Sequence, residues 1–145
     1  MPTYTPPLRD MQFVMHEVLQ VCDDFRAMPR HAEIDADTID AVLEQAGTFA
    51  AEVALPLNAS GDAQGCTFDP VTHAVRAPDG FKEAYAQYVA GGWPGLSCDV
   101  EYGGQGLPLV VNQCLYEMLN SANQAWTMYP GLTHGAYAAL HSYGT

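Results

Sequence analysis

The sequence predicts an all-α protein of about five or six helices with one glycine-rich loop. Apolar residues recur every three to four positions through most of the chain, which is the period of one helical face. Glycine and proline gather at a few places that separate these runs. With 145 residues, 48% of them hydrophobic and 15% charged, the chain has the size and composition of one globular domain.

The first predicted helix follows Pro6 and Pro7 and runs from about residue 8 to residue 25. Pro29 closes this element. His16 lies off the apolar face, where we expect it to be solvated or hydrogen-bonded. The residues that recur on the apolar face are Leu8, Met11, Met15, Val18, Cys22 and Phe25.

A second helix is predicted to begin near Asp35 and Asp37. Together with Asp40, these residues fall in the cap and first turn, where carboxylates interact favourably with the helix dipole. The acidic cluster is therefore interpreted as a solvated helix start. Pro56 predicts a kink or an end, and residues 58–62 (NASGD) predict a turn. The predicted buried stripe is Ile39, Val42, Leu43, Ala46, Phe49, Ala50, Val53 and Leu57.

Residues 61–78 alternate only weakly and contain two glycines and two prolines, so they are predicted to be an ordered loop. A third helix is predicted over residues 79–90. The glycine-rich segment 91–108 that follows is too irregular for any regular element.

Pro108 suits the first position of a fourth helix. The sequence Tyr129-Pro130-Gly131 predicts a break in the helical pattern. A last helix is predicted to run from Thr133 to Ser142.

The balance of charge restricts the partners of the chain. Five basic residues against seventeen acidic ones give a formal net charge of −12. Binding to nucleic acid requires clustered cations, so nucleic acid is excluded as a partner, and the same field would repel coenzyme A or a nucleotide. Lys82 is the only lysine, and no basic residue follows it. The cationic parts of a phosphate-binding site are therefore expected outside this chain.

No run approaches the ~18 apolar residues of a membrane span. Residues 1–11 lack the basic and apolar regions of a secretory signal, and we expect a cytoplasmic protein. In that compartment cysteines without a CxxC pair are expected to be reduced and mostly buried. The four cysteines are Cys22, Cys66, Cys98 and Cys114.

Motifs typical of catalysis are incomplete. GLSCD at residues 95–99 differs from a nucleophile elbow because Asp99 replaces the last glycine and no strand precedes it. Ser97 is therefore not predicted to be a nucleophile. GGQG at residues 103–106 lacks the third glycine of a dinucleotide-binding loop.

Metal-binding patterns are incomplete as well. A calcium loop that begins at Asp35 would need glycine and glutamate where Asp40 and Ala46 stand. His134 and His141 lie on one predicted helix, separated by about 10.5 Å at ~1.5 Å per residue, which is too far for two ligands of one metal. No catalytic residue and no metal ligand is predicted, and for His134 a contact in a pocket wall stays open.

Residues 91–108, GGWPGLSCDVEYGGQGLP, resemble the GW-x-GL…EYGGQGLP signature in the helical amino-terminal domain of the acyl-CoA dehydrogenase family. The chain departs from the family at Asp99, where proline is usual. This substitution is expected to cost some loop rigidity and to leave the chemistry untouched. The matching residues are Gly92, Trp93, Gly95, Leu96, Glu101, Tyr102, Gly103, Gly104, Gln105, Gly106, Leu107 and Pro108.

Residues 1–19 resemble the helical leader of one subgroup of that family, typified by enzymes acting on 3-(methylthio)propanoyl-CoA and on long-chain acyl-CoA. Residues 141–145 resemble the point where family members continue toward a middle β-domain. The resemblance implies an orthogonal helical bundle. It also implies a leader over residues 1–36 and the amino-terminal helical domain over residues 37–145, with the middle β-domain and the carboxy-terminal helical domain absent.

Family members remove hydrogens from Cα and Cβ of an acyl-CoA thioester, using a glutamate base and FAD. The resemblance implies that the base and most FAD contacts belong to domains that this chain does not match. The chain alone is therefore expected to be inactive and to bind no FAD. The full-length enzyme is expected to use acyl-CoA and electron-transfer flavoprotein as partners and to form a homo-oligomer.

The resemblance further implies that the segment before residues 143–145 supplies a wall of the acyl pocket. Small residues in that segment would leave room for an acyl chain, although they would also suit close helix packing. The candidate wall residues are Thr127, Tyr129, Gly131, Leu132 and Gly135. The alternative function is a free-standing helical module that binds an acyl chain or a protein partner.

Overall fold

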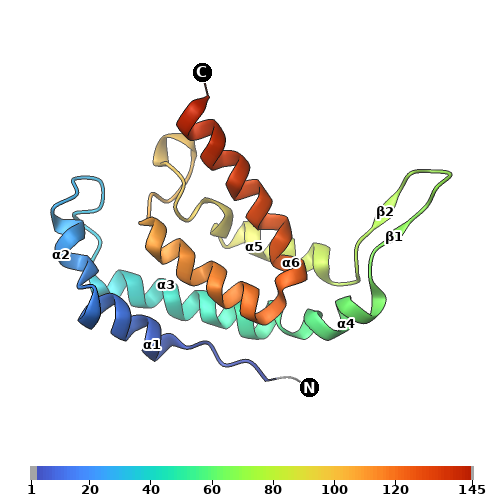
Figure 1. Ribbon diagram of the computed structural model, residues 1–145, viewed down its shortest axis with the longest axis horizontal. Helices are drawn as coiled ribbons and strands as arrows, with labels where there is room; N and C mark the ends of the chain where they lie inside the picture. The colour runs from blue at the N-terminus through green and yellow to red at the C-terminus, as the bar shows by residue number, and fades with distance from the viewer. Residues whose placement is uncertain (1–2, 145) are drawn as a thin grey trace.

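The computed structural model describes residues 3–144, which are mostly helical and carry one small β-hairpin (Figure 1). The prediction of an all-α fold is confirmed. Among the described residues, no helix is long and apolar enough to cross a membrane.

The predicted first helix is interrupted. It consists of α1 (Leu8–Gln12), a π-helical turn η1 (Phe13–Val18) and α2 (Val21–Arg26). Between them Gln20 adopts a left-handed conformation with φ of 52°. This break rotates the apolar face, so Val21 is buried while Val18, predicted inward, is 58% exposed.

The second helix begins as predicted. Asp35 caps α3 (Ala36–Phe49) by accepting a hydrogen bond of 2.8 Å from the amide of Thr38. The helix continues through a π-helical turn η2 (Ala50–Ala54) into α4 (Pro56–Gln64).

The predicted turn at residues 58–62 is wrong, because α4 runs through it. Pro56 occupies the first turn of α4, where a missing amide hydrogen is tolerated. Gly61 is kept inside this helix by packing: a Cβ there would lie 2.6 Å from the Phe81 ring.

The predicted loop 61–78 is also more regular than expected. After α4 it forms an antiparallel hairpin of β1 (Thr67–Phe68) and β2 (Val75–Arg76), with Thr67 opposite Arg76. Figure 1 shows this hairpin projecting away from the helices. Both strands are exposed, so their alternation carried little hydrophobic signal.

The third helix, α5 (Phe81–Ala90), lies close to its predicted bounds. The glycine-rich segment that follows contains two short 3₁₀ turns, η3 (Trp93–Gly95) and η4 (Val100–Tyr102). The segment closes on itself through hydrogen bonds from Gln105 N to Gly95 O (2.8 Å) and from Leu107 N to Leu96 O (3.0 Å). Leu96 is its buried anchor, whereas Trp93 is half-buried.

The predicted break near Tyr129-Pro130-Gly131 is wrong. Helix α6 (Leu109–Tyr143) runs through Pro130 and is kinked earlier, at Asn123 (φ −160°, ψ 86°). The Asn123 side chain accepts from Trp126 N (3.1 Å) and donates to Ala54 O (3.1 Å). It therefore caps the second half of α6 from within and ties the kink to η2.

The kink sets the arrangement of the molecule. In Figure 1 the first half of α6 runs beside α3, and the second half turns away to rise beside the glycine-rich segment. The core lies between α3, η2, α5 and α6, and is completed by side chains of the first three helical elements and of the glycine-rich segment. Its largest fully buried side chains are Trp126, Tyr88, Met15, Ile39, Leu43, Leu96, Leu115, Met118 and Leu119.

Candidate functional site

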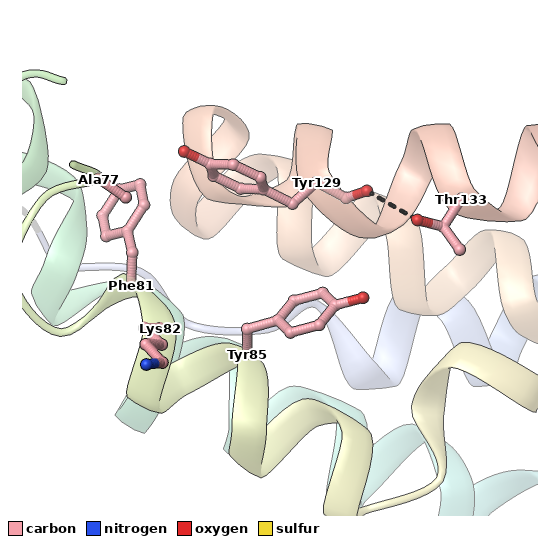
Figure 2. Close-up of a pocket in the computed structure, with 6 residues that line it drawn as sticks. All are labelled: Ala77, Phe81, Lys82, Tyr85, Tyr129 and Thr133. Carbon is pink, nitrogen blue, oxygen red and sulfur yellow. Dashed lines mark hydrogen bonds between the residues drawn. The ribbon is translucent and has the colours of Figure 1, made fainter. Parts of the chain in front are cut away.

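A pocket of about 300 Å³ lies between α5 and the second half of α6 (Figure 2). Aromatic and aliphatic groups form most of its wall. Its lining residues are Ala77, Phe81, Lys82, Tyr85, Tyr129 and Thr133.

The kink in α6 builds this pocket. Phe81 and Tyr85 lie one helical turn apart on α5, and the turn at Asn123 directs Tyr129 of α6 toward them. The Phe81 and Tyr129 rings meet edge to face, with centroids 6.2 Å apart. Trp126 Nε1 donates to Phe81 O at 3.1 Å, which fixes the two helices relative to one another.

Tyr129 connects the pocket to the hairpin. Its hydroxyl lies 3.9 Å from Cys66 Sγ, which lies just before β1. Burial, and then the neighbouring Cys66 thiol, raise the pKa of Tyr129. The phenol is therefore neutral at physiological pH and available as a hydrogen-bond donor.

A second pocket of about 240 Å³ continues from the first, because both are bordered by Tyr85 and Thr133. It lies between the second half of α6 and the glycine-rich segment, and Pro130, His134 and Tyr137 form part of its wall. The two pockets therefore lie next to one another along α6. The 91–108 segment is thus part of a pocket wall as well as a loop.

Asp99 fixes the glycine-rich segment to α6. Its amide donates to the Tyr137 hydroxyl at 2.7 Å, and its carboxylate lies 3.1 Å from Arg30 Nη2 and 3.6 Å from His141 Nε2. The amide of Glu101, followed by Arg30 and His141, lowers the pKa of Asp99. The carboxylate thus joins three segments of the chain, and the expected cost in loop rigidity stays a prediction.

The charges of the site do not suit FAD. Among the described residues, Lys82 is the one basic side chain without a carboxylate within 4.0 Å, and one ammonium group does not neutralise a diphosphate. No step of a flavin reaction is assigned to these residues. The other four basic side chains, all arginines, form the ion pairs Arg9–Glu17, Arg26–Asp23, Arg30–Asp99 and Arg76–Asp79.

Only one predicted wall residue, Tyr129, lines the first pocket. Thr127 is buried, and its hydroxyl donates to Asn123 O at 2.8 Å within the helix. Leu132 is 74% exposed, and Gly135 faces open space. A Cβ on Gly131 would meet only the Tyr116 ring, at 3.8 Å.

The remaining candidates from the sequence do not lie together as a catalytic site. His16 is hydrogen-bonded to Asp40 at 2.7 Å, as the first-helix pattern predicts. Within the described part of the chain the Ser97 hydroxyl has no hydrogen-bond partner and hence no base. In the same range no cluster of three metal-ligating side chains occurs, and all four cysteines are free.

The pocket residues that sequence reasoning missed lie on α5, just before it and, for Thr133, on α6. Phe81 and Tyr85 belong to the predicted apolar face of helix 79–90, and their spacing of four residues is the only signal they carry. Ala77 and Thr133 carry none. These side chains come together because α6 is kinked at Asn123. The sequence analysis predicted the break at residues 129–131 instead.

No family model matches the chain. Two curated acyl-CoA dehydrogenases are nevertheless similar to nearly all of it, and the chain belongs to the acyl-CoA dehydrogenase family. It is 38% identical over 143 residues to the 3-methylmercaptopropionyl-CoA dehydrogenase of Ruegeria pomeroyi, covering 99% of this chain and 24% of that protein. It is 31% identical over 131 residues to the broad-specificity linear acyl-CoA dehydrogenase FadE5 of Mycobacterium tuberculosis, covering 90% of this chain and 21% of that protein.

Proposed function

We propose that this chain is the amino-terminal helical part of an FAD-dependent enzyme that dehydrogenates an acyl-CoA thioester between Cα and Cβ. The similarity to two acyl-CoA dehydrogenases carries the proposal: it covers 99% and 90% of this chain but only 24% and 21% of theirs. The chain is therefore a part of such an enzyme, with a leader over residues 1–36 and the helical domain over residues 37–145.

In this proposal the chain forms a wall of the acyl pocket and supplies neither the base nor the flavin site. Tyr129 is the predicted wall residue that the first pocket favours, because it faces Phe81 from the opposite helix. FAD is held by other domains of the enzyme, in keeping with the single unpaired cation among the described residues. The whole enzyme works in the cytoplasm as a homo-oligomer and passes electrons to electron-transfer flavoprotein.

The proposal is tested by purifying residues 1–145 and recording an absorption spectrum after incubation with excess FAD. We expect no retained flavin band and no acyl-CoA dehydrogenase activity. A flavin band near one equivalent per chain would contradict the proposal.

The gene provides a second test. A reading frame that continues past Thr145 for several hundred codons is expected, whereas a stop codon at that point would favour the free-standing helical module instead.

A further inference from the structure

The leader carries a row of exposed apolar side chains on its outer face. Figure 1 shows α1 along the lower edge of the molecule, beside α3 and away from the hairpin. Met11 and Met15, on the inner face of the leader, are buried. Four side chains form the exposed row, here called the leader ridge, and each is between 44% and 58% exposed: Phe13, Val14, Val18 and Leu19.

The π-helical turn η1 makes these side chains one ridge. In a π-turn each amide bonds to the carbonyl five residues earlier, and Leu19 N donates to Val14 O at 2.9 Å. Residues five apart therefore lie above one another, Val18 over Phe13 and Leu19 over Val14. In an α-helix such residues would point about 140° apart, and the row would be scattered around the helix.

Two opposite charges flank the ridge symmetrically. Arg9 lies four residues before Phe13, and Glu17 lies four residues after it. Arg9 Nη2 and Glu17 Oε1 are 3.6 Å apart, and the two side chains are 80% and 55% exposed. An ion pair this exposed contributes little to stability, so its partners can be exchanged at little cost.

This order of charges is complementary to itself. When two helices pack antiparallel about a two-fold axis at Phe13, each residue before Phe13 faces the residue equally far after it in the other copy. Arg9 then faces Glu17 of the partner subunit, and the same contact occurs a second time. Two ion pairs within the chains are replaced by two between them, so a second copy of this chain suits both the apolar ridge and its charges.

We propose that two copies of this chain pair through the leader ridge, antiparallel, with their Phe13 side chains at the two-fold axis and Arg9 of each copy paired with Glu17 of the other. Stable interfaces bury about 1,200–2,000 Å² in total, which is more than one helical ridge provides, so the contact is weak and depends on concentration. It rests on the homo-oligomer proposed above and names one of its contacts.

Two charge reversals test this contact. Arg9→Glu and Glu17→Arg each place like charges opposite one another twice, so either variant alone should dimerise about ten-fold more weakly than wild type in sedimentation equilibrium. An equimolar mixture of the two variants places opposite charges at both positions. We expect the mixture to regain the wild-type affinity. With one variant labelled with ¹⁵N, native mass spectrometry should show more mixed dimers than random pairing gives.

Matched variants separate this contact from effects of net charge. Arg26→Glu and Glu44→Arg have the same two net charges as the test pair and alter exposed side chains outside the ridge, so their mixture should pair at random. Phe13→Ala should weaken the dimer without any change of charge, whereas Phe68→Ala, at an exposed position of the hairpin, should not. If a charge reversal fails to fold by circular dichroism, the two alanine variants decide alone.

Two results would overturn the proposal. Random pairing of Arg9→Glu with Glu17→Arg would show that the leaders do not meet, and would leave the ridge to another domain of the enzyme. Wild-type affinity of Phe13→Ala would show the same. Neither result would touch the dehydrogenase function, which the flavin spectrum and the reading frame test separately.

Discussion

The carboxylate of Asp99 connects the glycine-rich segment to two other segments of the chain. This carboxylate pairs with Arg30 and His141, while the backbone amide of Asp99 donates to the Tyr137 hydroxyl. Tyr137 and His141 also stack on each other, with ring centroids 5.4 Å apart.

This arrangement predicts a pH-dependent effect of Asp99→Asn. The pKa of Asp99 is lowered in the folded chain, so its contribution to stability is present above the unfolded value of about 3.9 and is lost as the pH falls through the folded value. We expect wild type to melt above Asp99→Asn at pH 7 and the two melting temperatures to converge as the pH falls below about 4.

Melting curves of both proteins across that range provide the measurement. Arg30→Gln is a useful comparison, because it removes one partner of Asp99 and keeps the amide of Glu101, the largest cause of the shift. Arg30→Gln should therefore show part of the decrease in melting temperature that Asp99→Asn shows at pH 7. A constant difference between wild type and Asp99→Asn down to pH 2 would show that the carboxylate charge is not involved.

At the scale of elements, the decisive feature is the kink in α6. Asn123 is buried and uses both ends of its amide, accepting from Trp126 N and donating to Ala54 O. Because the kink turns Tyr129 toward Phe81, the pocket depends on a residue that does not line it.

We predict that Asn123→Ala destabilises the chain by roughly 2–4 kcal/mol, since each buried group left without its partner costs about 1–3 kcal/mol. Thermal unfolding measures this loss. Asn112→Ala is the matched control: Asn112 is equally buried on the same helix, but its Nδ2 has no hydrogen-bond partner within the described range. Equal losses in the two variants would refute the role assigned to the Asn123 hydrogen bonds.

The sequence predicted helix starts and periodic faces better than interruptions. The Asp35 cap and the bounds of α5 follow from local chemistry that the chain carries wherever it is placed. The breaks at Gln20 and Asn123 do not, because neither residue is a strong breaker. Conversely, Pro130 lies inside a continuous helix, where packing outweighs its local preference, whereas Pro56 begins α4 at a first-turn position that tolerates proline.

At the scale of the whole molecule, apolar residues remain exposed on the outer side of α6. Met128, Leu132, Leu140 and Tyr143 follow one another along its second half, with exposures of 59%, 74%, 71% and 88%. The leader adds Phe13, Val14, Val18 and Leu19, each at least 44% exposed. Apolar surface of this kind is typical of regions that other parts of a protein or other subunits cover.

We therefore predict that residues 1–145 form dimers or larger assemblies through residues 108–143, with a further contribution from residues 8–25. Light scattering at rising concentration measures the assembly. Leu132→Lys is expected to shift it toward monomer, whereas Val71→Lys, at a position 87% exposed in the hairpin, leaves it unchanged. A monomer at every concentration would contradict this prediction.

The sequence alone determined the all-α class, the acyl-CoA dehydrogenase family and the shortage of basic residues. It could do so because helical periodicity, the motif at residues 91–108 and net charge are properties of the chain itself. Tertiary structure decided where the helices bend and which side chains share a pocket. Tyr129 meets Phe81 beyond the kink at Asn123, whose side chain bonds to the Ala54 carbonyl, a partner 69 residues away in the chain. Contacts at that separation leave no periodic trace in the sequence, so the pocket could not be predicted from it.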